Sequence, residues 1–199
     1  MTNIEYTPIA SSTLEKGASF HRTDRIFELV KLDDPANVVM TDLKKISAVT
    51  IAGKAPIEAA DARMKHRGVR LLLVVNDEDN VVGLITSTDL HGAKPIQHIQ
   101  KHGGTYHDIL VQDIMTHQEK LEVICMDDVN RTRVGNIVAT LKQAGRSHAL
   151  VVDRHESENK QVIRGIISAS QIARQLDMDI PTTEIAKTFA EIEALLSSV

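Results

Sequence analysis

The chain has 199 residues, of which 42% are hydrophobic and 25% charged, close to an average globular composition and enough to bury one or two small cores. Its net charge of −4 argues against general attraction to nucleic acid or anionic lipid, and its 3% aromatic content, without tryptophan, argues against base-stacking platforms. No apolar stretch approaches the ~20 residues of a membrane-spanning helix, and the first residues lack a secretion signal, so we expect a cytoplasmic protein that binds neither nucleic acid nor membrane.

Residues 1–36 form a polar flank of mixed composition, and the apolar residues around 23–31 have the spacing of a short helix. The segment Val38–Leu43 then leads into a short predicted strand, Ala48–Ile51. This strand is the first element of a longer ordered unit.

An amphipathic helix is predicted next, because Ile57, Ala60 and Met64 recur with the spacing of one helical face. Gly68 follows where a helix C-cap belongs, since glycine readily adopts the left-handed conformation needed there. The helix is therefore expected to end at this glycine.

Two continuous apolar runs follow, Leu71–Val75 and Val81–Ile85, on either side of a polar turn. Runs without polar alternation are typical of strands that are covered on both faces. A helix beginning at about Thr86 completes the unit.

The chain then repeats the same order of elements, with a helix, a glycine, two apolar runs and a final helix beginning at Ser168. Because an internal repeat determines architecture, we predict an α/β (α+β) fold in which two copies pack as a pseudo-twofold pair with a cleft between them. The matched positions, at an offset of 77 residues before the turn and 82 after it, are Met64 with Leu141, Gly68 with Gly145, Val75 with Val152, Gly83 with Gly165, and Thr86 with Ser168.

The single cysteine, Cys125, excludes an intrachain disulfide and aligns with Ala48 at the offset of 77, so we interpret it as a small core residue.

The polar stretch between the copies has room for one short helix. Its His98 and His102 have a spacing that can share a metal, but an acidic ligand pattern is missing, so we favour a solvated linker whose role stays open. The predicted segments are a flank at 1–36, repeats at 37–92 and 111–177, a linker at 93–110, and a C-terminal helix at 178–199.

Several motifs carry a family resemblance. They are D-I-M-T and V-M-T-D before the two copies, LLVVND and ALVVD in the first apolar runs, and GLITSTD and GIISASQ at the second ones. In this order, over roughly residues 37–177, they resemble two CBS domains in tandem, a Bateman module. The resemblance implies β-α-β-β-α units that pack by their sheets, and adenosine-containing ligands such as AMP, ADP, ATP or S-adenosylmethionine in the clefts. It also implies a regulatory role and a homodimer.

The step from Gly83 to Asp89 permits two interpretations. Thr86 falls at a helix start, where free backbone N–H groups favour a phosphate, and a carboxylate at Asp89 can accept hydrogen bonds from both hydroxyls of a ribose. The same two residues also form a variant capping box, which needs no ligand. The repeat leads us to favour ligand contact at Asp89, and both roles can coexist.

The second copy differs at the decisive position, where Gln171 replaces the acidic residue. Ser168 and Gln171 again have the spacing of a capping box, and an amide is a weaker partner for two hydroxyls than a carboxylate. We therefore expect one competent nucleotide site per chain, with Ser168 belonging to a second position that is weak or empty.

Phosphates also need cations. Arg70 stands at the start of a predicted strand, a position that in CBS pairs often faces the nucleotide, and His148 lies in the counterpart segment of the second copy. A solvated surface side chain is the alternative for each. Adenine is expected near Ala48 and Thr50, because base edges need backbone amides more than side chains.

The sequence contains no P-loop, no G-x-S-x-G and no nucleophile paired with a base. We therefore expect a regulatory module without an enzymatic activity, a required cofactor or a metal, acting on an unidentified protein. The alternative is a ligand-free interaction module in which Thr86 and Asp89 only cap a helix.

Overall fold

The structure is a computed structural model that describes residues 29–154 and 160–176. The helix expected at 178–199 lies outside these residues, as does most of the one expected around 23–31, whose described end is not helical. The first half contains η1 (Ala36–Val39), β1 (Met40–Asp42), β2 (Thr50–Ala52), α1 (Ile57–Arg67), β3 (Leu71–Val75), β4 (Val81–Thr86), α2 (Ser87–His91), α3 (Lys94–His102) and η2 (Tyr106–Asp108). The second contains α4 (Val111–Ile114), β5 (Thr116–His117), η3 (Gln118–Lys120), β6 (Val123–Cys125), α5 (Met126–Arg131), α6 (Val134–Gln143), β7 (His148–Arg154), β8 (Gln161–Ser168) and α7 (Ala169–Gln175).

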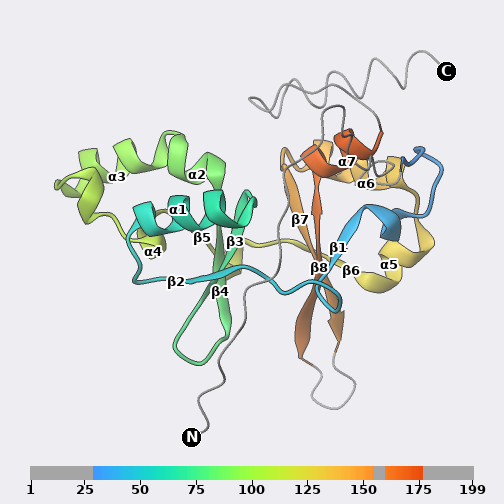
Figure 1. Ribbon diagram of the computed structural model, residues 1–199, viewed down its shortest axis with the longest axis horizontal. Helices are drawn as coiled ribbons and strands as arrows, with labels where there is room; N and C mark the ends of the chain where they lie inside the picture. Colours follow the sequence, from blue (N-terminus) through green and yellow to red (C-terminus); the bar gives the residue numbers. More distant parts are fainter. Residues whose placement is uncertain (1–28, 155–159, 177–199) are drawn as a thin grey trace, which may run out of the picture.

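The strands form two separate four-stranded sheets, ordered β2-β3-β4-β5 and β6-β7-β8-β1. In each sheet the first pair is parallel and the other two pairs are antiparallel. Both sheets even carry an irregularity at the same place, after Val74 and after Val151. The prediction of two similar α+β units with separate sheets is confirmed, and Figure 1 shows the sheets towards the middle with helices outside them.

The repeats exchange their leading strands. Strand β1, which precedes the first copy in sequence, pairs with β8 of the second sheet, and β5, which precedes the second copy, pairs with β4 of the first. The units in space therefore do not coincide with the continuous segments 37–92 and 111–177. Each sheet therefore has one edge strand that comes from the other copy.

The glycines of the two Gly-x-x-Thr/Ser steps lie where these exchanged strands pass. A Cβ added at Gly83 would lie 2.6 Å from the carbonyl oxygen of Thr116, and one added at Gly165 would meet the side chain of Met40. Glycine is needed here because another backbone segment approaches closely. Close strand packing thus accounts for Gly83 without a ligand.

The continuous apolar runs are covered on both faces, as predicted. In β3, Leu72 and Val74 are buried against the helices of the first half, whereas Leu71 and Leu73 lie in a cluster with Leu150 of β7. This last cluster contains residues from both sheets, so the two sheets face each other across it. A third cluster fills the space between the second sheet and its own helices.

The helix ends follow the sequence signals. Gly68 caps α1 with φ of 63°, and Gly145 follows α6 with φ of 61°, both in the left-handed region that favours glycine. The predicted linker contains the expected α-helix, α3, and also the short 3-10 helix η2, and the residue after η2, Ile109, is buried in the first core.

Two predictions near the first strand are wrong. The strand is Thr50–Ala52 rather than Ala48–Ile51, and Ala52 pairs with Val75 as Cys125 pairs with Val152. Cys125 is therefore equivalent to Ala52 and not to Ala48, because the second copy has additional residues, including α5, between its first strand and its helix. Cys125 is partly buried.

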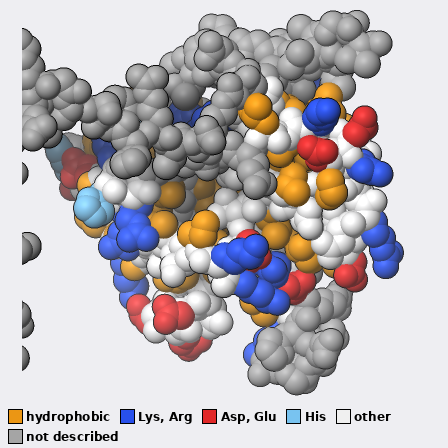
Figure 2. All heavy atoms as spheres, turned by 45° about the vertical axis from the view of Figure 1, so that its right-hand side comes forward, with side chains coloured by type: hydrophobic (Ala, Val, Ile, Leu, Met, Phe, Trp, Pro, Cys, Tyr) orange, Lys and Arg blue, Asp and Glu red, His pale blue; other side chains and the backbone are white. Residues whose placement is uncertain are grey.

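The surface of the second half is mixed. In Figure 2, which turns this half forward, hydrophobic side chains lie among basic and acidic ones. In the part of the chain that the structure describes, no helix is both long and apolar enough to cross a bilayer.

Candidate functional site

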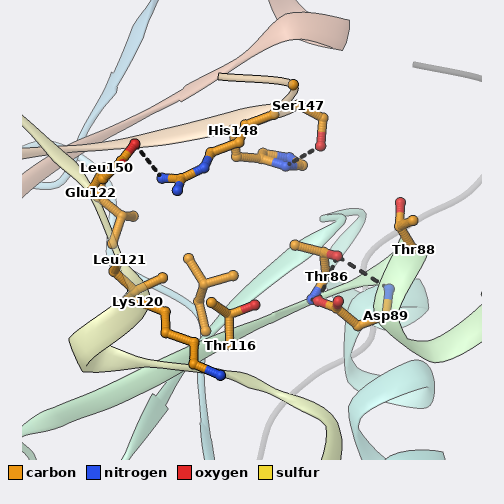
Figure 3. A pocket seen from close by; sticks show the side chains of 13 residues that line it. Thr86, Thr88, Asp89, Thr116, Lys120, Leu121, Glu122, Ser147, His148 and Leu150 are labelled. Atoms are coloured by element: carbon orange, nitrogen blue, oxygen red, sulfur yellow. Dashed lines mark hydrogen bonds and ion pairs between the residues drawn. The ribbon is translucent and has the colours of Figure 1, made fainter. Parts of the chain in front are cut away.

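The candidate site is a cavity of about 250 Å³ between the two halves, which we call the inter-repeat pocket. Its first-half wall comes from the end of β4 and the start of α2, and its second-half wall from η3 and the turn before β7 (Figure 3). This volume is slightly below the ~300–1,000 Å³ usual for small-molecule sites. Its polar lining includes Thr86, Asp89, Thr116, Lys120, Arg146 and His148.

Asp89 is placed by the start of α2. Its Oδ2 accepts hydrogen bonds from the backbone N–H of Thr86 at 2.8 Å and from the Thr86 hydroxyl at 2.7 Å, and its own N–H donates to that hydroxyl at 3.3 Å. The capping box predicted for Thr86 and Asp89 is therefore formed. The side chain is only 11% exposed, yet it lines the pocket.

The other carboxylate oxygen of Asp89 has one partner. Its Oδ1 lies 2.7 Å from Nζ of Lys94, which also donates to the carbonyl of Ile114 at 3.0 Å. Because each carboxylate oxygen can accept about two hydrogen bonds, Oδ1 keeps one position for a ligand hydroxyl. A second hydroxyl at this atom would have to displace Lys94.

His148 faces Asp89 from the second half. Its ring Nδ1 lies 2.9 Å from the hydroxyl of Ser147, as Figure 3 shows. The pKa of His148 is lowered to about 4, chiefly by burial and also by the charge of Arg70, while the charge of Asp89 opposes the shift. At neutral pH the imidazole is therefore uncharged and offers one donor and one acceptor.

The remaining charges of the pocket lie on η3 and the segments beside it. Arg146 Nη1 forms an ion pair with Glu122 Oε2 at 3.2 Å, and Lys120 lies on the same wall. Apolar contact comes from Leu84, Leu121 and Leu150. The pocket thus combines leucine side chains with hydrogen-bonding groups from both halves.

The structure brings together only some of the residues singled out from the sequence. Thr86, Asp89 and His148 share the inter-repeat pocket. Ala48 and Thr50 line a separate depression beside α1. Arg70 lies at the exposed start of β3, outside the pocket lining but close enough to affect His148.

Ser168 lies at the start of α7 on the other sheet, and its predicted capping box with Gln171 is wrong. The Ser168 hydroxyl contacts that of Ser170 at 3.0 Å, and no side-chain hydrogen bond caps the helix. Gln171 instead accepts a hydrogen bond at Oε1 from the hydroxyl of Thr41 at 3.1 Å. The amide is directed to the exchanged strand β1 because that strand supplies a nearby donor.

Sequence reasoning missed Thr116 and Lys120. Both precede β6 and belong by sequence to the second copy, but the strand exchange places them beside the first copy's Asp89. The motif D-I-M-T that contains Thr116 was a usable signal, since a motif repeated before each copy indicates a shared structural place. The described residues contain no group of three or more histidine, cysteine or acidic side chains able to hold a metal.

Comparisons with known proteins agree with this architecture. The CBS domain family model matches residues 36–95. An uncharacterised conserved protein from Pyrococcus horikoshii has a similar structure, at 26% identity over 77% of this chain and 100% of that one, with a TM-score of 0.53. No curated protein matches the sequence.

Two further solved structures are more distant. A CBS-domain containing protein from Agrobacterium tumefaciens is 16% identical over 67% of this chain and 88% of its own, with a TM-score of 0.49. The Arabidopsis thaliana protein CBSX2 in complex with AMP is 20% identical over 71% and 94%, with a TM-score of 0.46.

Proposed function

We propose that this CBS-domain protein is a regulatory module that binds an adenosine-containing ligand, AMP, ADP, ATP or S-adenosylmethionine, in the inter-repeat pocket. The observation that carries the proposal is the position of Asp89. Its carboxylate is held by the backbone at the wall of the pocket, and one of its oxygens keeps a free acceptor position.

The pocket chemistry supports a nucleoside. A ribose hydroxyl would donate to Oδ1 of Asp89, in a charge-assisted hydrogen bond that is stronger than a neutral one. Leu84, Leu121 and Leu150 offer apolar surface for a base, and the neutral imidazole of His148 faces the same space. A ligand held by groups from both halves would change the free energy of their relative arrangement, which is how a ligand shifts a conformational equilibrium.

Calorimetry on wild type and Asp89→Asn tests this proposal. Loss of a charge-assisted hydrogen bond should weaken nucleotide binding by roughly 1.5–3 kcal/mol, about ten- to a hundredfold. The matched control is Asp108→Asn, because Asp108 forms the same kind of capping box with Thr105, away from the pocket. Equal affinity of wild type and Asp89→Asn for every adenosine ligand would rule out the assignment.

The choice among ligands is made by thermal unfolding with AMP, ADP, ATP, S-adenosylmethionine and NADH. A ligand that binds only the folded state stabilises it by about 2.7 kcal/mol at a hundredfold excess over its dissociation constant. A melting temperature that none of the five raises favours the second candidate function below.

That second candidate is a ligand-free interaction module, and the specific observation in its favour is that Asp89 is already well bonded. Its carboxylate contacts Thr86 and Lys94 within the chain. In this case Asp89→Ala lowers the stability by ~1 kcal/mol through loss of the cap and leaves any nucleotide affinity unchanged.

The proposed module has no chemistry of its own and acts as a homodimer that a partner protein reads. Exposed large hydrophobic side chains such as Val38, Val123 and Val162 give apolar surface for such contacts. Light scattering should give twice the chain mass of 21.9 kDa at micromolar concentration, and a single-chain mass would exclude the dimer.

A further inference from the structure

A second cavity adjoins the inter-repeat pocket. It has a volume of about 420 Å³, lies between α3 and β5, and shares Thr116 and Lys120 with the pocket. We call it the α3 groove. A ligand seated at Asp89 that extends past Thr116 and Lys120 therefore enters this groove.

The α3 groove is basic in a chain whose net charge is −4. Its cationic and imidazole side chains are Lys94, Lys101, Lys120, His98, His102 and His117. The one carboxylate in its lining, that of Asp113, already accepts a hydrogen bond from the backbone N–H of Leu110 at 2.8 Å.

The lysines differ in how far they are neutralised. Lys94 is paired with Asp89 at 2.7 Å. Lys101 and Lys120, in contrast, have no ion pair or hydrogen bond to any other residue in the described ranges 29–154 and 160–176. Two ammonium groups at one groove without a carboxylate partner favour an anionic ligand, because a lysine binds phosphate as a point charge.

The imidazoles point to the same class of ligand. His98 and His102 lie one turn apart on α3, with their rings stacked at a centroid distance of 4.6 Å and an interplanar angle of 9°. Lys94, Lys101 and these two histidines share one broad helical face, since they stand at i, i+4, i+7 and i+8. Each imidazole offers a ring nitrogen donor to a phosphate oxygen.

We propose that the α3 groove binds an oligophosphate. With the nucleoside at Asp89, Lys120 contacts the part of the phosphate chain that crosses from the pocket, and Lys101 contacts its distal end. This assignment of the nucleoside end rests on the proposed function, and it implies that a nucleoside triphosphate binds more tightly than the monophosphate. A free inorganic oligophosphate has the same chemistry and could occupy the groove by itself.

The test is calorimetry at fixed ionic strength with adenosine, AMP, ATP and inorganic tripolyphosphate. The variant is Lys101→Gln, which alters the groove and not the pocket, and the matched control is Lys45→Gln, an exposed lysine outside both. We expect Lys101→Gln to weaken ATP and tripolyphosphate about tenfold, the size of one lost charge-assisted contact, with adenosine and AMP unchanged. Lys45→Gln should bind all four as wild type does.

The outcomes separate the groove from the proposed function. If AMP binds in an Asp89-dependent way and Lys101→Gln binds ATP and tripolyphosphate as well as Lys45→Gln does, the groove assignment is overturned and the proposed function stands. If tripolyphosphate binds in a Lys101-dependent way while adenosine and AMP do not bind, the groove assignment stands and the proposed function fails. If neither ATP nor tripolyphosphate binds to the wild-type protein, the groove assignment is likewise overturned.

Discussion

The two halves have the same strand order but differ at the helix start that follows the last long strand of each. In the first half, Asp89 caps α2 and lines the inter-repeat pocket. In the second, Gln171 leaves its helix uncapped and is bonded to Thr41 of the exchanged strand. Thr41 and Thr116 are equivalent, since each lies opposite the second residue before the Thr/Ser of the step.

The positions that face these two helix starts also differ in polarity, and again the first-half site has the more polar residue. His148, which faces Asp89, is equivalent to Leu71 by the strand pairing, and Leu71 is buried in the cluster between the sheets. One side of the pseudo-symmetric pair therefore presents ionisable groups to a cavity, and the other presents an amide and a leucine. A symmetric backbone thus carries side chains of different chemistry at equivalent positions of the two halves.

The largest expected difference concerns pH. The pKa of His148 is about 4 in the folded chain and 6.5 in the unfolded reference, so between these values the unfolded state takes up a proton that the folded state does not. Stability is therefore fully present above pH 6.5 and is lost as the pH falls towards 4, by on the order of 3 kcal/mol. Urea unfolding from pH 7 to 4 measures this loss of stability. The reference is His148→Leu, which carries the leucine that the other half has at the equivalent position. Parallel profiles for both proteins would contradict the shift.

The next difference concerns the two exchanged strands. Gly83→Ala should lower the unfolding free energy by about 2–3 kcal/mol, because its Cβ would lie 2.6 Å from a backbone oxygen that cannot rotate away. Gly165→Ala should cost somewhat less, about 1–2 kcal/mol, because the Met40 side chain must move but the nearest backbone oxygen, that of Thr41, would lie at 3.0 Å. The control is Gly53→Ala, whose nearest neighbour would be at 3.5 Å. Equal costs at Gly83 and Gly53 would contradict the close strand approach.

The two exchanged strands, β1 and β5, differ in the side-chain contacts that hold them to their sheets. Arg164 on β8 binds both carboxylate oxygens of Asp42 on β1 and also contacts Asp153 at 3.2 Å, with Arg164 15% and Asp42 17% exposed. Removing one partner of such a pair is costly, so Asp42→Asn should lower stability by about 2 kcal/mol. His117, the equivalent position on β5, should tolerate asparagine within about 0.5 kcal/mol. Denaturant unfolding of both variants measures the two losses of stability. Similar losses for Asp42→Asn and His117→Asn would contradict a difference between the two exchanged strands.

Much of the fold was predictable because it depends on local patterns. The helical spacing before Gly68, the left-handed glycines and the unbroken apolar runs each have one physical explanation, and the structure contains all of them. The strand exchange was not predictable, because a three-residue strand such as β1 carries no periodicity that says which sheet it joins. The offset of the first strand was missed for a related reason, since α5 adds residues inside the second copy.

The candidate site was predictable only where one motif contains it. Thr86 and Asp89 stand three residues apart and cap the same helix, so sequence spacing was enough. Lys120 and Thr116 reach Asp89 through tertiary structure, and Ala48 and Thr50 do not share its pocket. Ser168 and Gln171 have capping spacing, but the nearby hydroxyls of Ser170 and Thr41 take their hydrogen bonds instead.

The smallest expected effect comes from making the two halves alike. Gln171→Asp restores a carboxylate three residues after Ser168, so we expect it to form the missing capping box and raise stability by about 0.5 kcal/mol. It should also add a second, weaker nucleotide site, because the new carboxylate supplies the ribose acceptor that Gln171 lacks while Leu71 stands in place of the imidazole. Calorimetric stoichiometry should rise from one towards two per chain, and Gln171→Asn controls for the shorter side chain. A stoichiometry that stays at one, with the stability gained, would mean that Leu71 and the packed sheets close this side regardless of the charge at 171.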